Sequence, residues 1–360
     1  MQVRLANYRD LSRVDDLYRA TEVADPDLLR RLRAAGPHGP IPGPGLARAW
    51  YIVNKSLSAL VPLADPADQL YVAEERGRIV GFIQAEPAPG GRAWQILNLC
   101  LAPDAPGPFV AGPLIEHLFA EGQERGVTRF LVRLPAEHPL EGILRAQGFS
   151  PYATEQIRFR ELPAPPSDDP GPWIPARTED LGGIHALYLR TAPHTVAAIE
   201  APSLKVWRTT FQLGWLSRIQ GRGSDGRHYV IDRGHGLVAW AGLRLPARAR
   251  PAMVGMMLDP QEGRLAVEAV HGLLNLLPRG PTLSVLRHYD SELVRAIEAR
   301  GFEPIAAQLL MVRDLPMRLR ARVPARAKRA QLTGVIPVVH AGVSPVRLPH
   351  GPPARATLRP

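Results

Sequence analysis

The internal repeat is the feature of this chain that most constrains its fold. The same residue types recur in residues 6–21 and 176–191, at a constant offset of 170 positions. The matching pairs are Ala6 and Ala176, Asp10 and Asp180, Leu11 and Leu181, Val14 and Ile184, Leu17 and Leu187, Tyr18 and Tyr188, and Thr21 and Thr191. In each set the apolar residues fall on one face of a helix, and the Asp lies near the helix start, where a carboxylate stabilises free backbone amides. The repeat therefore predicts two copies of one domain.

Two further matches follow in the same order in each copy. A hairpin at residues 78–82 resembles one at 236–240, and each comes after an apolar strand and a glycine-containing turn. Later in each copy a helix ends at a Gly-Phe pair, at Gly148 and at Gly301. Such a glycine suits a left-handed C-cap, and the phenylalanine returns to the core. Three matches in one order indicate a duplicated domain.

Hydrophobic periodicity predicts the same order of elements in both copies: a strand, one or two helices, an antiparallel meander, helix, strand, helix and closing strands. In the first copy the three strands of the meander are expected at residues 69–75, 79–86 and 94–102. A helix at 113–125, a strand at 128–134, a helix at 138–147 and closing strands up to residue 161 follow. In the second copy the meander is expected at residues 228–233, 237–245 and 252–258. A helix at 263–277, a strand at 282–286, a helix at 291–300 and a closing strand at 308–313 follow. The predicted class is α/β (α+β), each copy a mixed, mostly antiparallel twisted sheet flanked by helices.

Composition divides the chain into four parts. Residues 163–172 are too rich in proline to continue a strand or a helix, so we expect a linker between an N-terminal domain, 1–162, and a C-terminal domain, 173–315. Nine of the 44 Lys and Arg residues follow residue 315, where there is no Asp or Glu, which leaves 35 basic against 34 acidic residues. Nine of the ten net positive charges therefore lie in the segment 316–360, which we expect to be a disordered, solvated tail. This tail is the only region with the charge to attract nucleic acid.

Other features exclude several classes of protein. No apolar stretch is long enough to span a bilayer, and the N-terminus lacks an apolar signal core, which predicts a cytoplasmic protein without a membrane span. The lone cysteine, Cys100, lies in an apolar run and is expected to be a buried thiol. No cluster of His, Cys and Asp has the spacing of metal ligands, so no metal site is expected.

The order of elements, the Gly-Phe pairs and a strand that leads into a loop and a long helix resemble the GNAT superfamily of acyl-CoA N-acyltransferases, over nearly all of residues 1–315. The resemblance implies a cleft between two splayed strands. It also implies a loop at the next helix N-terminus, whose amides bind the pyrophosphate of acetyl-CoA. The activity implied is acetyl transfer from acetyl-CoA to an amine acceptor, either a small molecule or a peptide. In the family the long segments 24–63 and 194–227 line the acceptor site.

The first copy keeps the length of the family's pyrophosphate loop, but several of its residue types differ. Residues 103–114 align without gaps to the family pattern, which places cofactor-binding positions at Leu101, Gly107, Val110 and Gly112. Three prolines, Pro106, Pro108 and Pro113, each remove an amide donor, and Phe109 stands at a usual glycine position. We expect this loop to bind pyrophosphate poorly, with Pro113 at the first position of its helix.

The second copy has the less altered loop, at residues 259–266. Gln261 and Ala266 match the motif's first and last positions, whereas Arg264 replaces a glycine. We therefore expect the C-terminal copy to be the active one. Its expected cofactor-binding residues are Leu258, Gln261, Gly263, Arg264 and Ala266.

The family's usual proton donor is missing from both copies. Many family members carry a tyrosine four residues before the Gly of Gly-Phe, and here those positions hold Leu144 and Ile297. Possible replacements are His138 in the first copy and His288, Tyr289 and Asp290 after the strand 282–286 in the second. Of these, Tyr289 and His288 are the candidate catalytic residues, since a donor with a pKa near that of a thiol could protonate a departing thiolate. The first hypothesis is an acetyltransferase with a structural N-terminal copy. The alternative is a non-catalytic tandem domain that binds a ligand or a protein.

Overall fold

The computed structural model describes residues 1–22, 69–88, 92–161, 171–200, 203–205, 226–244, 252–277 and 280–316. Most of the predicted linker, the tail from residue 317 and most of the two segments expected to line an acceptor site lie outside these ranges. Met1–Arg318 form one compact unit.

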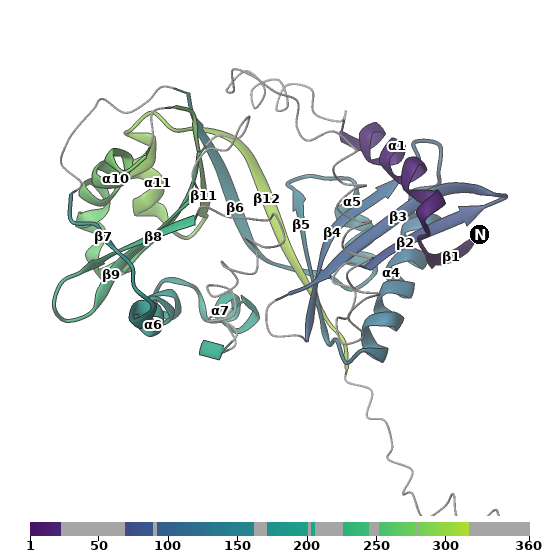
Figure 1. Ribbon diagram of the computed structural model, residues 1–360, viewed down its shortest axis with the longest axis horizontal. Helices are drawn as coiled ribbons and strands as arrows, with labels where there is room; N and C mark the ends of the chain where they lie inside the picture. The colour runs from purple at the N-terminus through teal and green to yellow at the C-terminus, as the bar shows by residue number, and fades with distance from the viewer. Residues whose placement is uncertain are drawn as a thin grey trace, which may run out of the picture. The chain divides into compact units, whose positions relative to one another are not determined.

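The first half follows the predicted order of elements (Figure 1). Its strands are β1 (Gln2–Leu5), β2 (Gln69–Glu75), β3 (Arg78–Pro87), β4 (Ala93–Leu101), β5 (Arg129–Pro135) and β6 (Ser150–Arg160). Its helices are the 3-10 turn η1 (Tyr8–Asp10), α1 (Leu11–Glu22), α4 (Gly107–Glu124) and α5 (Leu140–Ala146). A single long strand, β6, takes the place of the several closing strands that were expected.

The second half repeats this order. Its strands are β7 (Ile174–Pro175), β8 (Gly226–Asp232), β9 (Leu237–Arg244), β10 (Ala252–Leu258), β11 (Thr282–Arg287) and β12 (Glu303–Asp314). Its helices are η2 (Thr178–Asp180), α6 (Leu181–Thr191), α7 (His194–Glu200), η3 (Pro260–Leu265), α10 (Ala266–Asn275) and α11 (Ser291–Glu298).

Helix α4 begins earlier than the sequence suggested. It starts at Gly107, so Pro108 lies in the first turn, where a missing amide costs little. Pro113 therefore lies inside the helix, and the prediction that it occupies the first helical position is wrong. Periodicity could not locate this start, because the prolines before Pro113 suggested a loop.

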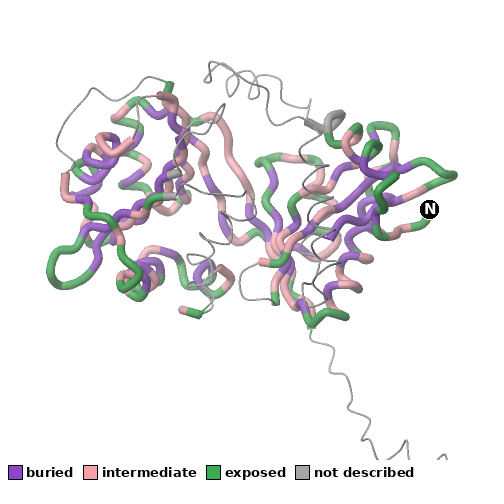
Figure 2. The backbone as a smooth tube through the Cα atoms, in the orientation of Figure 1, coloured by how far each residue is buried: buried purple, intermediate pink, exposed green. Residues whose placement is uncertain are grey.

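Alternating side chains divide each half into two apolar layers. Along β2, Tyr71 and Ala73 pack in the core under α4, whereas Leu70 and Val72 pack in the core under α1. The same alternation occurs in β8, where Tyr229 and Ile231 face α10 and α11 while Val230 faces α6 and α7. Figure 2 shows buried residues both along the strands and on the helices that cover them. Each half is thus a sheet covered by helices on both faces, as predicted.

The ends of the repeat are conserved in three dimensions between the two halves. Gly148 and Gly301 have φ angles of +82° and +80°, a left-handed conformation that favours glycine. The following amides bond back into the helix: Phe149 N donates to Leu144 O at 3.0 Å, and Phe302 N donates to Ile297 O at 3.3 Å. Both phenylalanines are buried. The predicted C-caps are confirmed.

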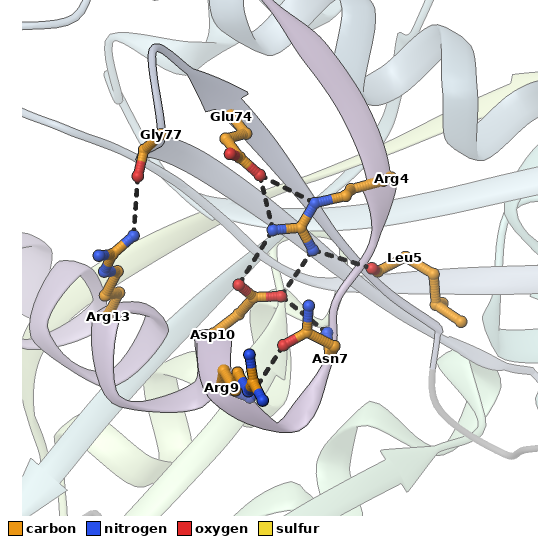
Figure 3. Close-up of polar contacts among 8 residues, drawn as sticks. All are labelled: Arg4, Leu5, Asn7, Arg9, Asp10, Arg13, Glu74 and Gly77. Carbon is orange, nitrogen blue, oxygen red and sulfur yellow. Dashed lines mark hydrogen bonds and ion pairs between the residues drawn. The ribbon is translucent and has the colours of Figure 1, made fainter.

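The start of the first helix is held by a polar network in the first half. The Asp10 carboxylate accepts a bond from Asn7 N at 2.8 Å, as the repeat predicted. Arg4 lies between Asp10 and Glu74 and bonds to both carboxylates, at 2.7 Å each (Figure 3). In the second half Asp180 likewise accepts from Arg177 N at 2.7 Å, but Ile174 stands at the position that corresponds to Arg4.

The two halves share one sheet because their last strands are exchanged. The order is β1-β2-β3-β4-β5-β12-β6-β11-β10-β9-β8-β7. Thus β12, from the second half, pairs with β5, while β6, from the first half, pairs with β11, and β6 and β12 run antiparallel between them (Figure 1). Neighbouring residues of β12 pack into different cores: Met311 joins the core under α4, and Leu310 joins the core under α6.

Candidate functional site

Two strands splay apart in each half. In the second half, β10 and β11 pair in parallel from Ala252–Thr282 to Gly255–Val285. Beyond Gly255, β10 continues to pair only with β9. In the first half β4 and β5 likewise pair from Ala93 to Ile96 and then separate. The fold therefore places a cleft at the same point in both halves.

A cavity of about 140 Å³ lies where β10 and β11 separate. Its apolar wall comes from Trp240 and from residues 255–257 and Val285. Its polar lining consists of Glu155, Tyr188, Thr191, Arg287, Tyr289 and Asp290. Glu155 belongs to β6, so the exchanged strand of the first half contributes to the site in the second half.

Glu200, at the end of α7, anchors the charged side chains beside this cavity. Its carboxylate accepts bonds from Arg287 Nη2 at 2.6 Å, from Tyr188 OH at 2.6 Å and from Tyr152 OH at 2.9 Å. Burial and the negative charge of Glu200 raise the pKa of both tyrosines, which keeps their hydroxyls protonated as donors. Glu200 therefore fixes the position of the Arg287 guanidinium.

Glu155 is held more loosely. Its Oε1 lies 3.4 Å from Arg287 Nε and its Oε2 lies 3.5 Å from Arg133 Nη1, distances of ion pairs without good hydrogen bonds. The Glu155 side chain is only 5% exposed. Among the described atoms, Glu155 Oε2 and Arg287 Nη1 are both buried and have no hydrogen-bond partner.

Burial also changes the acid strength of two groups at the cavity. It raises the pKa of Asp290 to about 7, against the opposing effects of a backbone hydrogen bond and of the Arg287 charge. It raises the pKa of Tyr289 above its usual value, with Arg287 opposing the shift. Asp290 can therefore take up or release a proton near neutral pH, and Tyr289 stays protonated.

The two predicted catalytic residues lie in different environments. Tyr289 lines the cavity. His288 is exposed, and its Nδ1 lies 3.3 Å from the carbonyl oxygen of Thr154, away from the cavity lining. Leu144 and Ile297, at the family's tyrosine positions, are buried in the two cores.

The loop of the second half uses several polar groups internally. Asp259 caps η3: its side chain accepts from Gln261 N at 3.0 Å, and its carbonyl accepts from Glu262 N at 2.9 Å. Its carboxylate also pairs with Arg190 at 2.8 Å. A β-carbon at Gly263 would lie 3.2 Å from Glu292 Cγ, so an acidic side chain packs against this loop. Leu258 and Ala266 are buried, while Gln261 and Arg264 are exposed and accessible to a ligand.

The loop of the first half offers fewer donors. Pro106 and Pro108 have no amide hydrogen, and Phe109 N donates to Pro106 O at 2.9 Å. The Phe109 side chain is 76% exposed at the helix N-terminus. Of the predicted cofactor-binding positions, Val110 and Gly112 are buried, and Leu101 and Gly107 are partly buried. This geometry does not suit a pyrophosphate.

Strand register identifies what the first half has in place of Glu155 and Arg287. Glu155 pairs with Gln308 near the middle of β6 and β12. Glu155 also pairs with Arg287, and Gln308 correspondingly pairs with Pro135. Gln308 and Pro135 cannot form a charged pair, so the first half has no counterpart of the Glu155–Arg287 pair at these positions.

Sequence reasoning missed Glu155 and Arg287 as site residues, and it named Asp290 beside His288 and Tyr289 without giving it a role of its own. Glu155 lies in the other copy, and no sequence pattern revealed the strand exchange that brings it to the cavity. The sequence held one signal: a glutamate in the middle of an otherwise regular strand, where a charge has to find a partner.

Three further expectations concern features outside the cavity. The thiol of Cys100 is buried, as predicted. In the described part of the chain no group of three or more His, Cys, Asp and Glu residues is arranged to hold a metal ion. No helix within the described ranges is long and apolar enough to cross a membrane.

Comparison with known proteins identifies the fold. Residues 40–149 match the sequence model of the acetyltransferase (GNAT) family. A tandem GNAT protein from the clavulanic acid biosynthesis pathway superposes with a TM-score of 0.51 at 15% identity, covering 87% of this chain and 98% of its own. A GCN5-related N-acetyltransferase from Sphaerobacter thermophilus superposes with a TM-score of 0.53 at 12% identity, covering 87% and 95%. No curated protein matches the chain in sequence.

These likenesses extend over both halves of the chain. The family match over residues 40–149 supports acyl transfer as the general class of activity. The predicted mixed sheet flanked by helices is confirmed. The chain therefore has the GNAT fold in two tandem, diverged copies, and its residues 40–149 match the GNAT family in sequence.

Proposed function

We propose that the protein is an acyl-CoA-dependent N-acyltransferase whose active site is the cleft of the C-terminal half. The supporting observation is the cavity at the splay of β10 and β11, which has Tyr289 and Asp290 in its lining. The first half serves as a structural partner that supplies β6. Acetyl-CoA is the proposed acyl donor, and the acceptor is the amine of a small molecule or peptide.

The proposed reaction moves one proton from nitrogen to sulfur. The neutral amine attacks the thioester carbonyl carbon, so that the C–N bond forms, the C–S bond breaks and the electron pair stays on sulfur. Asp290, with a pKa of about 7, takes the proton from nitrogen and returns it to the thiolate. Tyr289, whose pKa is raised, donates a hydrogen bond to the leaving sulfur rather than its proton. His288 has no step in this scheme, because it lies outside the cavity.

Replacement of Asp290 by Asn tests this assignment. The wild type should lose acyl transfer as the pH falls below about 7, since protonated Asp290 cannot accept a proton. Asp290→Asn should lower kcat by roughly 10²- to 10⁴-fold and abolish that acidic limb. The control is Asp104→Asn, which changes an exposed carboxylate of the first half. An unchanged pH profile in Asp290→Asn would exclude Asp290 as the base.

Donor binding is tested separately. We propose that the exposed side chains of Arg264 and Gln261, with the backbone around Gly263, hold the pyrophosphate. The amide of Ala266, also expected to bind the cofactor, already donates to Gly263 O. Acetyl-CoA should raise the melting temperature of the wild type in a saturable manner. Arg264→Glu should abolish that increase, while Arg145→Glu, on the exposed face of the first half, should retain it.

The internal use of loop donors favours a second candidate, a non-catalytic tandem domain that binds a ligand or a protein. Amides of Gln261 and Glu262 are already bonded to Asp259, and the first loop lacks donors at its prolines. If no acyl-CoA changes the melting temperature, this second function replaces the first.

A further inference from the structure

Two opposite charges at the cavity have unused hydrogen-bonding capacity. Glu155 Oε2 is an acceptor without a donor, and Arg287 Nη1 is a donor without an acceptor. Buried polar atoms are nearly always bonded, and leaving one unsatisfied is destabilising, more so when the atom belongs to a charged group. The pair therefore suggests a ligand that supplies what each atom lacks.

A structural ion pair is the competing explanation for these two residues. Arg287, however, is already neutralised and oriented by Glu200, which accepts a 2.6 Å bond from Nη2. Glu155 is not needed for that purpose, and its distances of 3.4 and 3.5 Å to the neighbouring guanidinium groups are longer than hydrogen bonds in a structural pair. A structural role for Glu155 would leave its second oxygen without a donor.

We propose that the acceptor bound in this cavity is an amine that carries its own carboxylate, such as a small amino acid, with its nitrogen bound by Glu155 and its carboxylate by Arg287. This inference rests on the proposed function, because it names the acceptor class of the same site. The cavity of about 140 Å³ has room for a ligand of this size. It equals the space of about five water molecules at roughly 30 Å³ each.

The arrangement explains why one half alone would bind the acceptor. The counterparts of Glu155 and Arg287 in the first half are Gln308 and Pro135, which carry no charge. The exchanged strand β6 brings the carboxylate to the second cleft. We therefore expect one acceptor site in each chain.

Calorimetric titration of the full chain without acyl-CoA tests the inference. The probes are glycine, L-alanine and β-alanine, with ethylamine and propionate as analogues that keep one charge each. At least one amino acid should bind once per chain, with a Kd at least tenfold lower than that of either analogue. Glu155→Gln and Arg287→Lys should each raise that Kd at least tenfold.

Matched controls and a second readout keep the outcome clear. Glu141→Gln and Arg145→Lys make the same changes in an exposed pair on α5 and should leave the Kd unchanged. Thermal melting identifies a variant that fails to fold. Equal binding of ethylamine and the amino acids, or an unchanged Kd in folded Glu155→Gln, overturns the inference. So does a lack of binding by every probe.

The inference and the proposed function can fail independently. Binding of an amino acid without transfer from any acyl-CoA would leave the site intact and reject the enzyme. Transfer to ethylamine as fast as to the amino acids would support the enzyme and reject the zwitterion site.

Discussion

The two halves share the same arrangement of strands and helices and differ at the cleft where two strands separate. Both have the left-handed glycine after the last helix, the same alternation of apolar layers and the same point of strand separation. At matched register positions the second half has Glu155 and Arg287, whereas the first has Gln308 and Pro135. The comparison teaches that packing preserves the fold, while a few cleft positions decide which copy retains polar chemistry.

The largest expected effect tests how far the halves depend on each other. Met311→Ala should destabilise the fold by about 2–5 kcal/mol and act first on the core under α4, although its strand belongs to the second copy. Leu310→Ala should cost a similar amount but act on the core under α6. Hydrogen exchange of α4 and α6 measures the difference. Equal loss of protection in both helices for both variants would contradict the separation of the cores.

The next effect concerns one proline in each half. Pro113 lies inside α4, where it leaves the helix one amide short, whereas Pro260 lies in the first turn of η3. Pro113→Ala restores an amide inside the helix and should stabilise the protein by about 1–3 kcal/mol in urea unfolding. Pro260→Ala is the control, with a change near zero. A loss of stability in Pro113→Ala would show that the proline fits its site.

The two C-cap glycines should respond unequally to alanine. Both have positive φ, so either change should cost about 1–2 kcal/mol. A β-carbon at Gly148 would also lie 2.5 Å from Arg313 Nη1, whereas a β-carbon at Gly301 would lie within 4 Å of no described atom beyond its chain neighbours. Gly148→Ala should therefore be the more costly change in urea unfolding. Adding Arg313→Ala should remove the excess, and equal costs in the single variants would disprove it.

The smallest effect lies at the helix starts. The hydrogen bond from Arg4 and the bond from the Asn7 amide hold the pKa of Asp10 below its usual value, despite burial. Its stabilisation is thus complete above the unfolded pKa of about 3.9 and is lost as pH falls through the lower folded value. Asp10→Asn should cost about 1 kcal/mol at pH 7 and less below pH 4. Asp180 has no arginine side chain as a partner among the described residues, so Asp180→Asn should cost less in the same denaturation series.

Local patterns predicted most of the fold. Periodicity located β2 and β10 to the residue, and the Gly-Phe pairs located both C-caps, because each depends on nearby residues. The exchange of β6 and β12 could not be predicted, since either strand satisfies the same apolar pattern beside β5. Tyr289 follows β11 directly in the sequence, so a local pattern could single it out as a candidate. Glu155 reaches the cavity only because β6 pairs with β11, so no local pattern identified it.

The strand exchange also sets the order in which the molecule can form. Strand β5 ends at residue 135, but its neighbour β12 begins at residue 303. During synthesis the first half cannot complete its sheet until nearly all of the second half has been made. Contacts at such long sequence separation form slowly, and until they form the edges of β5 and β6 remain open. A tandem protein built this way folds as one late, shared event rather than half by half.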